Sequence, residues 1–127
     1  MTTIVRNNEF DIIQAARTND AFREVVLTGK KEQVVVMTIP VGGDIGSEVH
    51  PDTDQVLVFV DVQGRAELDG ATSSVGPNDL VFVRAGTQHN FTNVGNTPMR
   101  LITIYAPPEH APGTVHQTKA DAEADEH

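Results

Sequence analysis

Hydrophobic positions along the chain follow a helical spacing near the start and strand patterns afterwards. Residues 9–17, EFDIIQAAR, carry apolar side chains at helical spacing, which predicts a short amphipathic helix that ends before Asn19. From residue 22 onward, β-branched runs alternate with turn residues, at 22–29, 33–40, 55–62, 65–70, 71–75, 79–83, 89–93 and 99–105. Short runs at such regular intervals predict an all-β sandwich or barrel.

Turn residues predict how two of these strands pair. Asp69 and Gly70 separate GRAEL from ATSSV, and an Asp-Gly pair favours a type I′ turn because both central residues need a positive φ. We therefore expect these two strands to form an antiparallel hairpin.

Two of the runs, VVVMTI and VLVFV, are apolar on both faces. A strand with one wet face would alternate, so both sides of these strands should be covered, either by a second sheet or by another subunit. This pattern makes a homodimer an expectation of the sequence.

Composition narrows the class of protein. The 127 residues, 39% of them hydrophobic, suit one globular domain built on Val, Ile and Leu, with no Trp. The net charge is −9 and Lys and Arg form no run, so nucleic acid and anionic lipid are not expected partners. No apolar stretch is long enough to span a bilayer or to act as a signal, which predicts a cytoplasmic location and no membrane partner.

The chain divides into three expected parts. Residues 1–20 form an amino-terminal segment with the short helix, residues 21–107 the barrel, and residues 108–127 a carboxy-terminal arm and acidic tail. The proline-rich part should lie extended on the barrel, and residues 117–127 should be solvated and disordered. His110 and His116 are expected at the surface, with a lid role for His116 as the alternative.

The residues with side chains suited to metal binding or catalysis lie in two segments. Glu48 and His50 point to one face of an extended segment, and Gln55 begins the returning strand. His89 follows a Gly turn much later and shares a face with Phe91. Because the chain has no Cys, a metal would need His, Asp, Glu, Gln or backbone oxygen as ligands. The same spacing also fits ordinary polar residues at strand ends.

These segments resemble the paired motifs of the cupin superfamily, G(x)5HxH(x)3-4E(x)6G and G(x)5PxG(x)2H(x)3N. The first motif is matched in spacing by Gly42, Glu48, His50 and Gln55, and the second by Asn78, Arg84, Gly86, His89 and Asn93. The chain is similar to small single-domain bacterial cupins, including a subgroup labelled mannose-6-phosphate-isomerase-like. The resemblance implies a jelly-roll barrel with a short amino-terminal helix.

Several motif positions depart from the family. Glu48 stands for the first histidine, Gln55 for the glutamate, Val62 and Asn78 for glycines and Arg84 for the proline. Of the four family metal ligands, His50 and His89 are unchanged. The resemblance thus implies a set of Glu48, His50, Gln55 and His89, whose two nitrogen and two oxygen ligands suit Mn, Fe, Co, Ni or Zn without choosing among them.

Two functions follow from the resemblance. One is a metal-dependent isomerase, lyase or dioxygenase acting on a small oxygenated substrate, with Glu48 as general base if it is not a ligand. The other is a non-catalytic module that binds a small molecule.

Candidate pocket residues are Leu57, Phe59, Phe91, Tyr105 and Arg84. Core packing would explain the apolar ones equally well, Tyr105 could instead lie at the rim, and Arg84 could instead be an exposed turn residue paired with Asp79.

Overall fold

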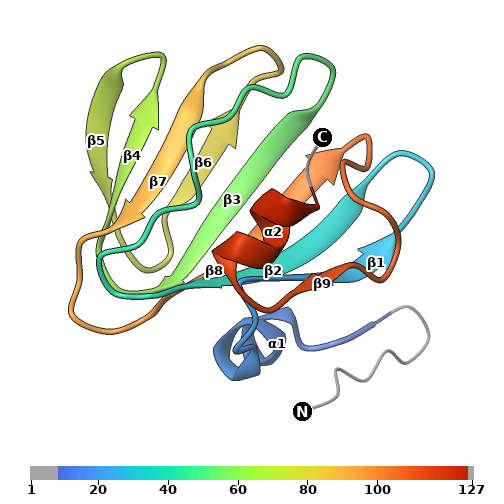
Figure 1. The fold of residues 1–127 in the computed structure, drawn as a ribbon, viewed down its shortest axis with the longest axis horizontal. Coiled ribbons are helices and arrows are strands. Elements are labelled where there is room, and N and C mark those ends of the chain that lie inside the picture. Colours follow the sequence, from blue (N-terminus) through green and yellow to red (C-terminus); the bar gives the residue numbers. More distant parts are fainter. Residues whose placement is uncertain (1–8, 126–127) are drawn as a thin grey trace.

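The structure is a computed structural model that describes residues 9–125 (Figure 1). Its elements, in chain order, are α1 (Ile12–Thr18), β1 (Arg23–Thr28), β2 (Gln33–Ile39), β3 (Asp54–Asp61), β4 (Gly64–Leu68), β5 (Ala71–Val75), β6 (Leu80–Val83), β7 (His89–Asn93), β8 (Met99–Ala106), β9 (Val115–His116) and α2 (Lys119–Ala124). Strands β1 to β8 confirm the eight runs predicted from the hydrophobic pattern.

The strands form two antiparallel sheets. One has six strands in the order β6-β3-β8-β2-β1-β9, and the other has three in the order β5-β4-β7 (Figure 1). The predicted hairpin is present, since β4 and β5 pair antiparallel across Asp69 and Gly70, whose φ angles are 48° and 86°. This double-sheet arrangement confirms the expected all-β jelly roll.

The core lies between the two sheets. Inward-facing residues of β3, such as Leu57 and Phe59, pack with Phe91 of β7, and the Phe59 and Phe91 rings are 5.6 Å apart. All three side chains are buried. Truncating one of these rings to alanine removes contacts from a close-packed interior and costs about 3–5 kcal/mol.

Helix α1 covers part of the outer face of the six-stranded sheet. Its buried Ala15 and Ala16 pack with Val36, Val60 and Ile102. The expected second sheet covers one face of VVVMTI and VLVFV, and α1, which was not expected there, covers part of the other. The expected second subunit stays a prediction. The Asp11 side chain caps the helix by accepting the Gln14 N–H at 3.0 Å.

The carboxy-terminal segment is ordered through Asp125, so the predicted disordered tail is wrong for residues 117–125. Strand β9 pairs with β1, and α2 follows it (Figure 1). Helix α2 begins with a capping box, in which the Thr118 side chain accepts the Asp121 N–H and the Asp121 side chain accepts the Thr118 N–H. Residues 126–127, and residues 1–8 of the amino-terminal segment, lie outside the described residues.

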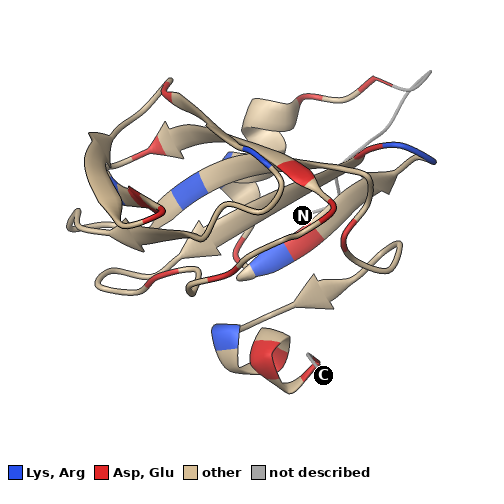
Figure 2. Cartoon of the chain, turned by 90° about the horizontal axis from the view of Figure 1, so that it is seen from above, with Lys and Arg blue, Asp and Glu red and all other residues tan. Residues whose placement is uncertain are grey.

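Charge is distributed without a basic face over the described part of the chain. Lys and Arg positions are scattered, apart from the adjacent Lys30 and Lys31 at one turn (Figure 2). Neither helix is long and apolar enough to cross a membrane.

Candidate metal centre

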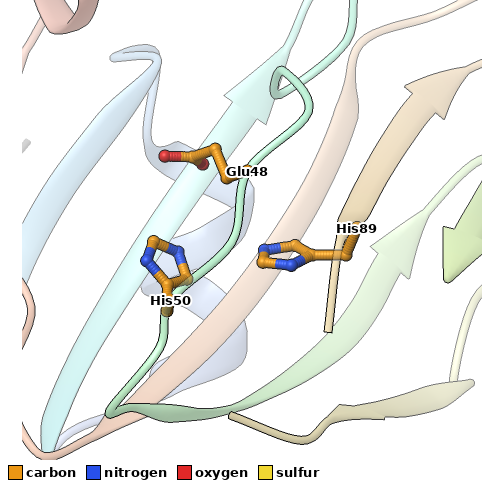
Figure 3. A group of neighbouring side chains, drawn as sticks. All are labelled: Glu48, His50 and His89. Atoms are coloured by element: carbon orange, nitrogen blue, oxygen red, sulfur yellow. The ribbon is translucent and has the colours of Figure 1, made fainter. Parts of the chain in front are cut away.

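Backbone hydrogen bonds bring the two distant motif segments together. The Glu48 N–H donates to the His89 carbonyl at 3.0 Å, and the His89 N–H donates to the Glu48 carbonyl at 2.9 Å. Residues paired in this way across an antiparallel ladder project their side chains to the same face. His50 follows Glu48 by two residues in an extended segment and shares that face. The local backbone thus directs all three side chains to one point (Figure 3).

The three side chains form a compact group. One ligand atom from each of Glu48, His50 and His89 lies within 4.8 Å of the others. The two imidazole rings are 5.2 Å apart, both histidines are buried and Glu48 is half-buried. Donor atoms at such separations can share one ion at bond lengths of about 2.0–2.2 Å after a small contraction.

Contacts at Nδ1 favour one tautomer of each histidine. His89 Nδ1 lies 2.9 Å from the Thr87 carbonyl, which can only accept, so Nδ1 carries the proton and Nε2 keeps its lone pair. His50 Nδ1 lies 3.4 Å from a Glu109 carboxylate oxygen, while His50 Nε2 is buried without a hydrogen-bond partner. Both rings therefore hold Nε2 available as a metal ligand.

Electrostatics keeps His89 neutral. Burial lowers the pKa of His89, and the neighbouring His50 lowers this pKa further. The Thr87 carbonyl and the Glu48 carboxylate act in the opposite direction but do not restore the ordinary value. A neutral imidazole is the form that binds a metal ion.

Gln55 supplies a second buried atom that lacks a partner. It lies on the inward face of β3, its Nε2 donates to Thr103 Oγ1 at 2.9 Å, and its Oε1 is buried without a hydrogen bond. A buried acceptor without a hydrogen bond costs about 1–3 kcal/mol. Two such atoms, His50 Nε2 and Gln55 Oε1, are therefore not expected if these residues serve only the fold. Divalent transition metals bind imidazole nitrogen and amide oxygen. His50 Nε2 and Gln55 Oε1 therefore fit such an ion.

A pocket of about 450 Å³ opens beside Glu48 and His50. Its other lining residues are Arg23, Glu109, His110, Ala111, Thr114, His116, Ala122 and Asp125. The carboxy-terminal segment thus forms one wall, and the buried Gln33 holds it there by accepting the N–H groups of Glu109 and His110.

The structure corrects the surface positions expected for His110 and His116. His116 is 7% exposed, with Nδ1 at 3.2 Å from Arg23 Nη1 and Nε2 at 3.0 Å from an Asp125 oxygen. His110 is partly buried, and its ring is 5.2 Å from that of Tyr105. The pairing of β9 with β1 buries His116 and places it at the pocket wall, and the lid alternative for this residue stays a prediction.

The remaining pocket candidates lie in different places. Tyr105 is 2% exposed, packs edge-on against the His50 ring at 5.8 Å, and has its pKa raised to about 12 by burial. Leu57, Phe59 and Phe91 belong to the core, with the Phe91 ring 6.2 Å from His89. Arg84 is exposed and lies over the Phe82 ring at 6.0 Å, which favours the surface alternative, although Asp79 is not its partner.

Sequence reasoning missed two residues of this region. Arg23 and Glu109 both line the pocket, and Glu109 contacts a candidate ligand. The one available signal was Arg23 itself. Of the two adjacent charges in the strand-like run FREVVL, it is the one that alternation places on the same face as Val25. No local pattern distinguished Glu109.

Comparison with known proteins identifies the family. Residues 35–105, more than half of the chain, match the family described as the cupin domain. The chain belongs to the cupin superfamily. This cupin is 43% identical over 122 residues to the uncharacterized protein YrkC of Bacillus subtilis, covering 91% of the chain but 66% of that relative's length.

Solved structures agree with the assignment. The crystal structure of BH2720 from Bacillus halodurans superposes with a TM-score of 0.92 at 40% identity, covering 94% of this cupin and 95% of that chain. An RmlC-like cupin from Shewanella frigidimarina superposes with a TM-score of 0.64 at 19% identity, covering 69% of this chain and 77% of the other. The second likeness shows the fold alone.

Proposed function

We propose that this cupin binds one divalent transition metal through Glu48, His50, Gln55 and His89 and takes a small oxygenated molecule into the adjacent pocket. The observation that carries the proposal is the group of Glu48, His50 and His89, whose ligand atoms lie within 4.8 Å of one another. The unpartnered His50 Nε2 and Gln55 Oε1 support it, because both are buried lone pairs beside no donor.

The pocket supports a catalytic version of this function. A bound ion would supply Lewis acidity toward a carbonyl or enediolate oxygen, which is the chemistry of isomerase-, lyase- and dioxygenase-type reactions. Glu48 is half-buried at the pocket wall and would serve as general base where it does not hold the ion. Tyr105 keeps its proton at neutral pH and presents a neutral wall beside His50.

The alternative is a non-catalytic binding module. It is favoured by the ligand set itself, in which Glu48 and Gln55 replace the family histidine and glutamate. An amide oxygen is a weaker ligand than a carboxylate, and a weakly held ion suits retention of a metabolite as well as turnover.

Turnover measurements separate the two versions. The protein is purified without chelators, loaded with Mn²⁺, Fe²⁺, Co²⁺, Ni²⁺ or Zn²⁺, and assayed against keto acids, sugars and diketones. The catalytic version predicts turnover that Glu48→Gln abolishes, whether through loss of a metal ligand or of a general base, with exposed Glu67→Gln on β4 as the control. Binding of these compounds without any product would leave the binding module. A protein that takes up none of these ions would refute the metal-dependent version.

We further propose a homodimer that forms on the outer face of the six-stranded sheet. Leu80 and Phe82 on β6 are 62% and 48% exposed, and they pair with the half-buried Val58 and Val56 of β3. Burial of these apolar side chains against a second copy would remove them from water. Light scattering that gives a monomer at micromolar concentration would refute the dimer, and Phe82→Asp should dissociate it.

Two finer assignments remain predictions from the sequence. These are the cytoplasmic location and the mannose-6-phosphate-isomerase-like label.

A further inference from the structure

Arg23 is a buried cation that makes no ion pair within the described residues. It begins β1 and is 5% exposed. Its Nη1 lies 3.2 Å from His116 Nδ1, and its Nε is buried with no hydrogen-bond partner. A guanidinium stays charged and has five N–H donors, so leaving it unpaired in the interior is costly.

The acids around the same pocket are already engaged. Glu48 belongs to the metal group, the Glu109 carboxylate contacts His50 Nδ1, and the Asp125 carboxylate contacts His116 Nε2. The Phe22 ring, 5.3 Å from the Arg23 guanidinium carbon, gives only partial compensation. Arg23 is thus the group of the pocket with unused donors.

Arg23 supplies the fixed positive charge of this pocket. Arg23 is the one Lys or Arg among the described residues that line it. Burial, with the charge of Arg23 as the second cause, lowers the pKa of His110 to about 3, so His110 is neutral and its buried Nε2 lacks a partner. A ligand would meet one fixed cation and one neutral ring nitrogen close to Glu48 and His50.

We propose that Arg23 binds the carboxylate of a small organic acid in this pocket, with a second oxygen of the same molecule directed to the metal group. The substrate class is therefore a short hydroxy or keto acid. The direction of the second oxygen rests on the proposed function, whereas the carboxylate site rests on Arg23 alone. A planar carboxylate matches the guanidinium fork, and a single negative charge suits a pocket lined by three acidic residues better than a phosphate dianion would.

Paired probes test the proposal directly. Acetate, lactate, pyruvate and malonate are titrated into the full chain by calorimetry, each beside its amide, with inorganic phosphate as a further probe. The amides of lactate and pyruvate keep the size and the second oxygen but lose the charge, acetate and acetamide test the charge alone, and the diamide of malonate loses both charges. We expect the carboxylates to bind at least tenfold more tightly than the amides. Equal binding of acid and amide, binding of phosphate alone, or no binding of any carboxylate would overturn the proposal.

Variants assign the effect to Arg23. Arg23→Met should weaken carboxylate binding by about 10- to 100-fold, the loss of a charge-assisted hydrogen-bonded pair, and Arg23→Lys should restore part of it. Arg65→Met, on the exposed face of β4, is the matched control and should bind as the wild type does. Unchanged carboxylate binding by Arg23→Met would refute the site.

A separate titration with Co²⁺ keeps the two proposals distinguishable. Uptake of Co²⁺ by Arg23→Met at wild-type affinity shows that the variant is folded and that only the carboxylate site is lost. If wild type takes up no Co²⁺ but still prefers carboxylates over amides through Arg23, the metal proposal fails and the carboxylate site stands.

Discussion

Glu48 and His89 exchange both of their backbone hydrogen bonds, at 3.0 and 2.9 Å, although they belong to segments far apart in the sequence. Because this bridge consists of backbone atoms, it survives replacement of either side chain. The positions of the candidate ligands are therefore set by the sheet, and substitutions at them should change metal binding more than folding.

Glu109 should act as a positioning residue for His50. Its carboxylate lies 3.4 Å from His50 Nδ1, and its negative charge favours a proton there and the lone pair on Nε2. Loss of such a partner typically weakens metal binding by about 10- to 100-fold. We expect this for Glu109→Gln in a competition titration with a chelating dye, with exposed Glu67→Gln unchanged. Equal affinities of Glu109→Gln and wild type would contradict the role.

Gln55→Glu should change stability in opposite directions with and without metal. A carboxylate in place of the buried amide binds a divalent ion more tightly, and we expect at least a tenfold gain in affinity. Without the ion, the same position buries a charge in place of a neutral amide and should lower the melting temperature. Thermal unfolding with and without Zn²⁺ measures both effects, and a variant stabilised in metal-free buffer would refute this position for Gln55 in the ligand set.

The sequence predicted those parts of the fold that depend on local pattern. Alternating runs and the Asp69-Gly70 turn placed eight strands and one hairpin, since side-chain period and turn conformation are local properties. Motif spacing likewise identified His50 and His89. It could not show that both Nε2 atoms are available, because this depends on the Thr87 carbonyl in the turn before His89 and on a tertiary contact of His50 with Glu109.

The carboxy-terminal wall of the pocket was not predicted, for two different reasons. The capping box of Thr118 and Asp121 is a local signal for α2 that the acidic composition of the tail obscured. The burial of His116 has no local signal, because it depends on β9 pairing with β1. Arg23 became significant only once that pairing placed it beside His116.

His110 should make the protein less stable as the pH falls. Its pKa is about 3 in the folded protein, below the ordinary value of 6.5, because burial disfavours the charged ring. Between these values the unfolded chain binds a proton that the folded chain does not, so stability is lost from about pH 6.5 downward. The melting temperature of His110→Asn should therefore fall less than that of wild type between about pH 7 and pH 5, measured in chelator-treated samples. Parallel losses in the two proteins would contradict this.

Val62 stands where the family motif has glycine, and its φ is 65°. This left-handed conformation costs a residue with a side chain about 1–2 kcal/mol and is especially unfavourable for a β-branched one. Val62→Gly should consequently be at least as stable as wild type in urea unfolding, despite the lost packing. The control Val58→Gly, a half-buried strand position of β3, should lose about 1 kcal/mol or more. Similar destabilisation of both variants would show that the strain is absent.

The metal content of the purified protein tests the central claim most directly. Elemental analysis of protein prepared without chelators and loaded with Zn²⁺ or Co²⁺ should give one ion per chain for wild type. His50→Ala and His89→Ala should each retain almost none, although the backbone bridge keeps them folded by circular dichroism, and His116→Ala should retain the ion. A wild type without stoichiometric metal, or full retention in both histidine variants, would contradict a metal centre built on Glu48, His50 and His89.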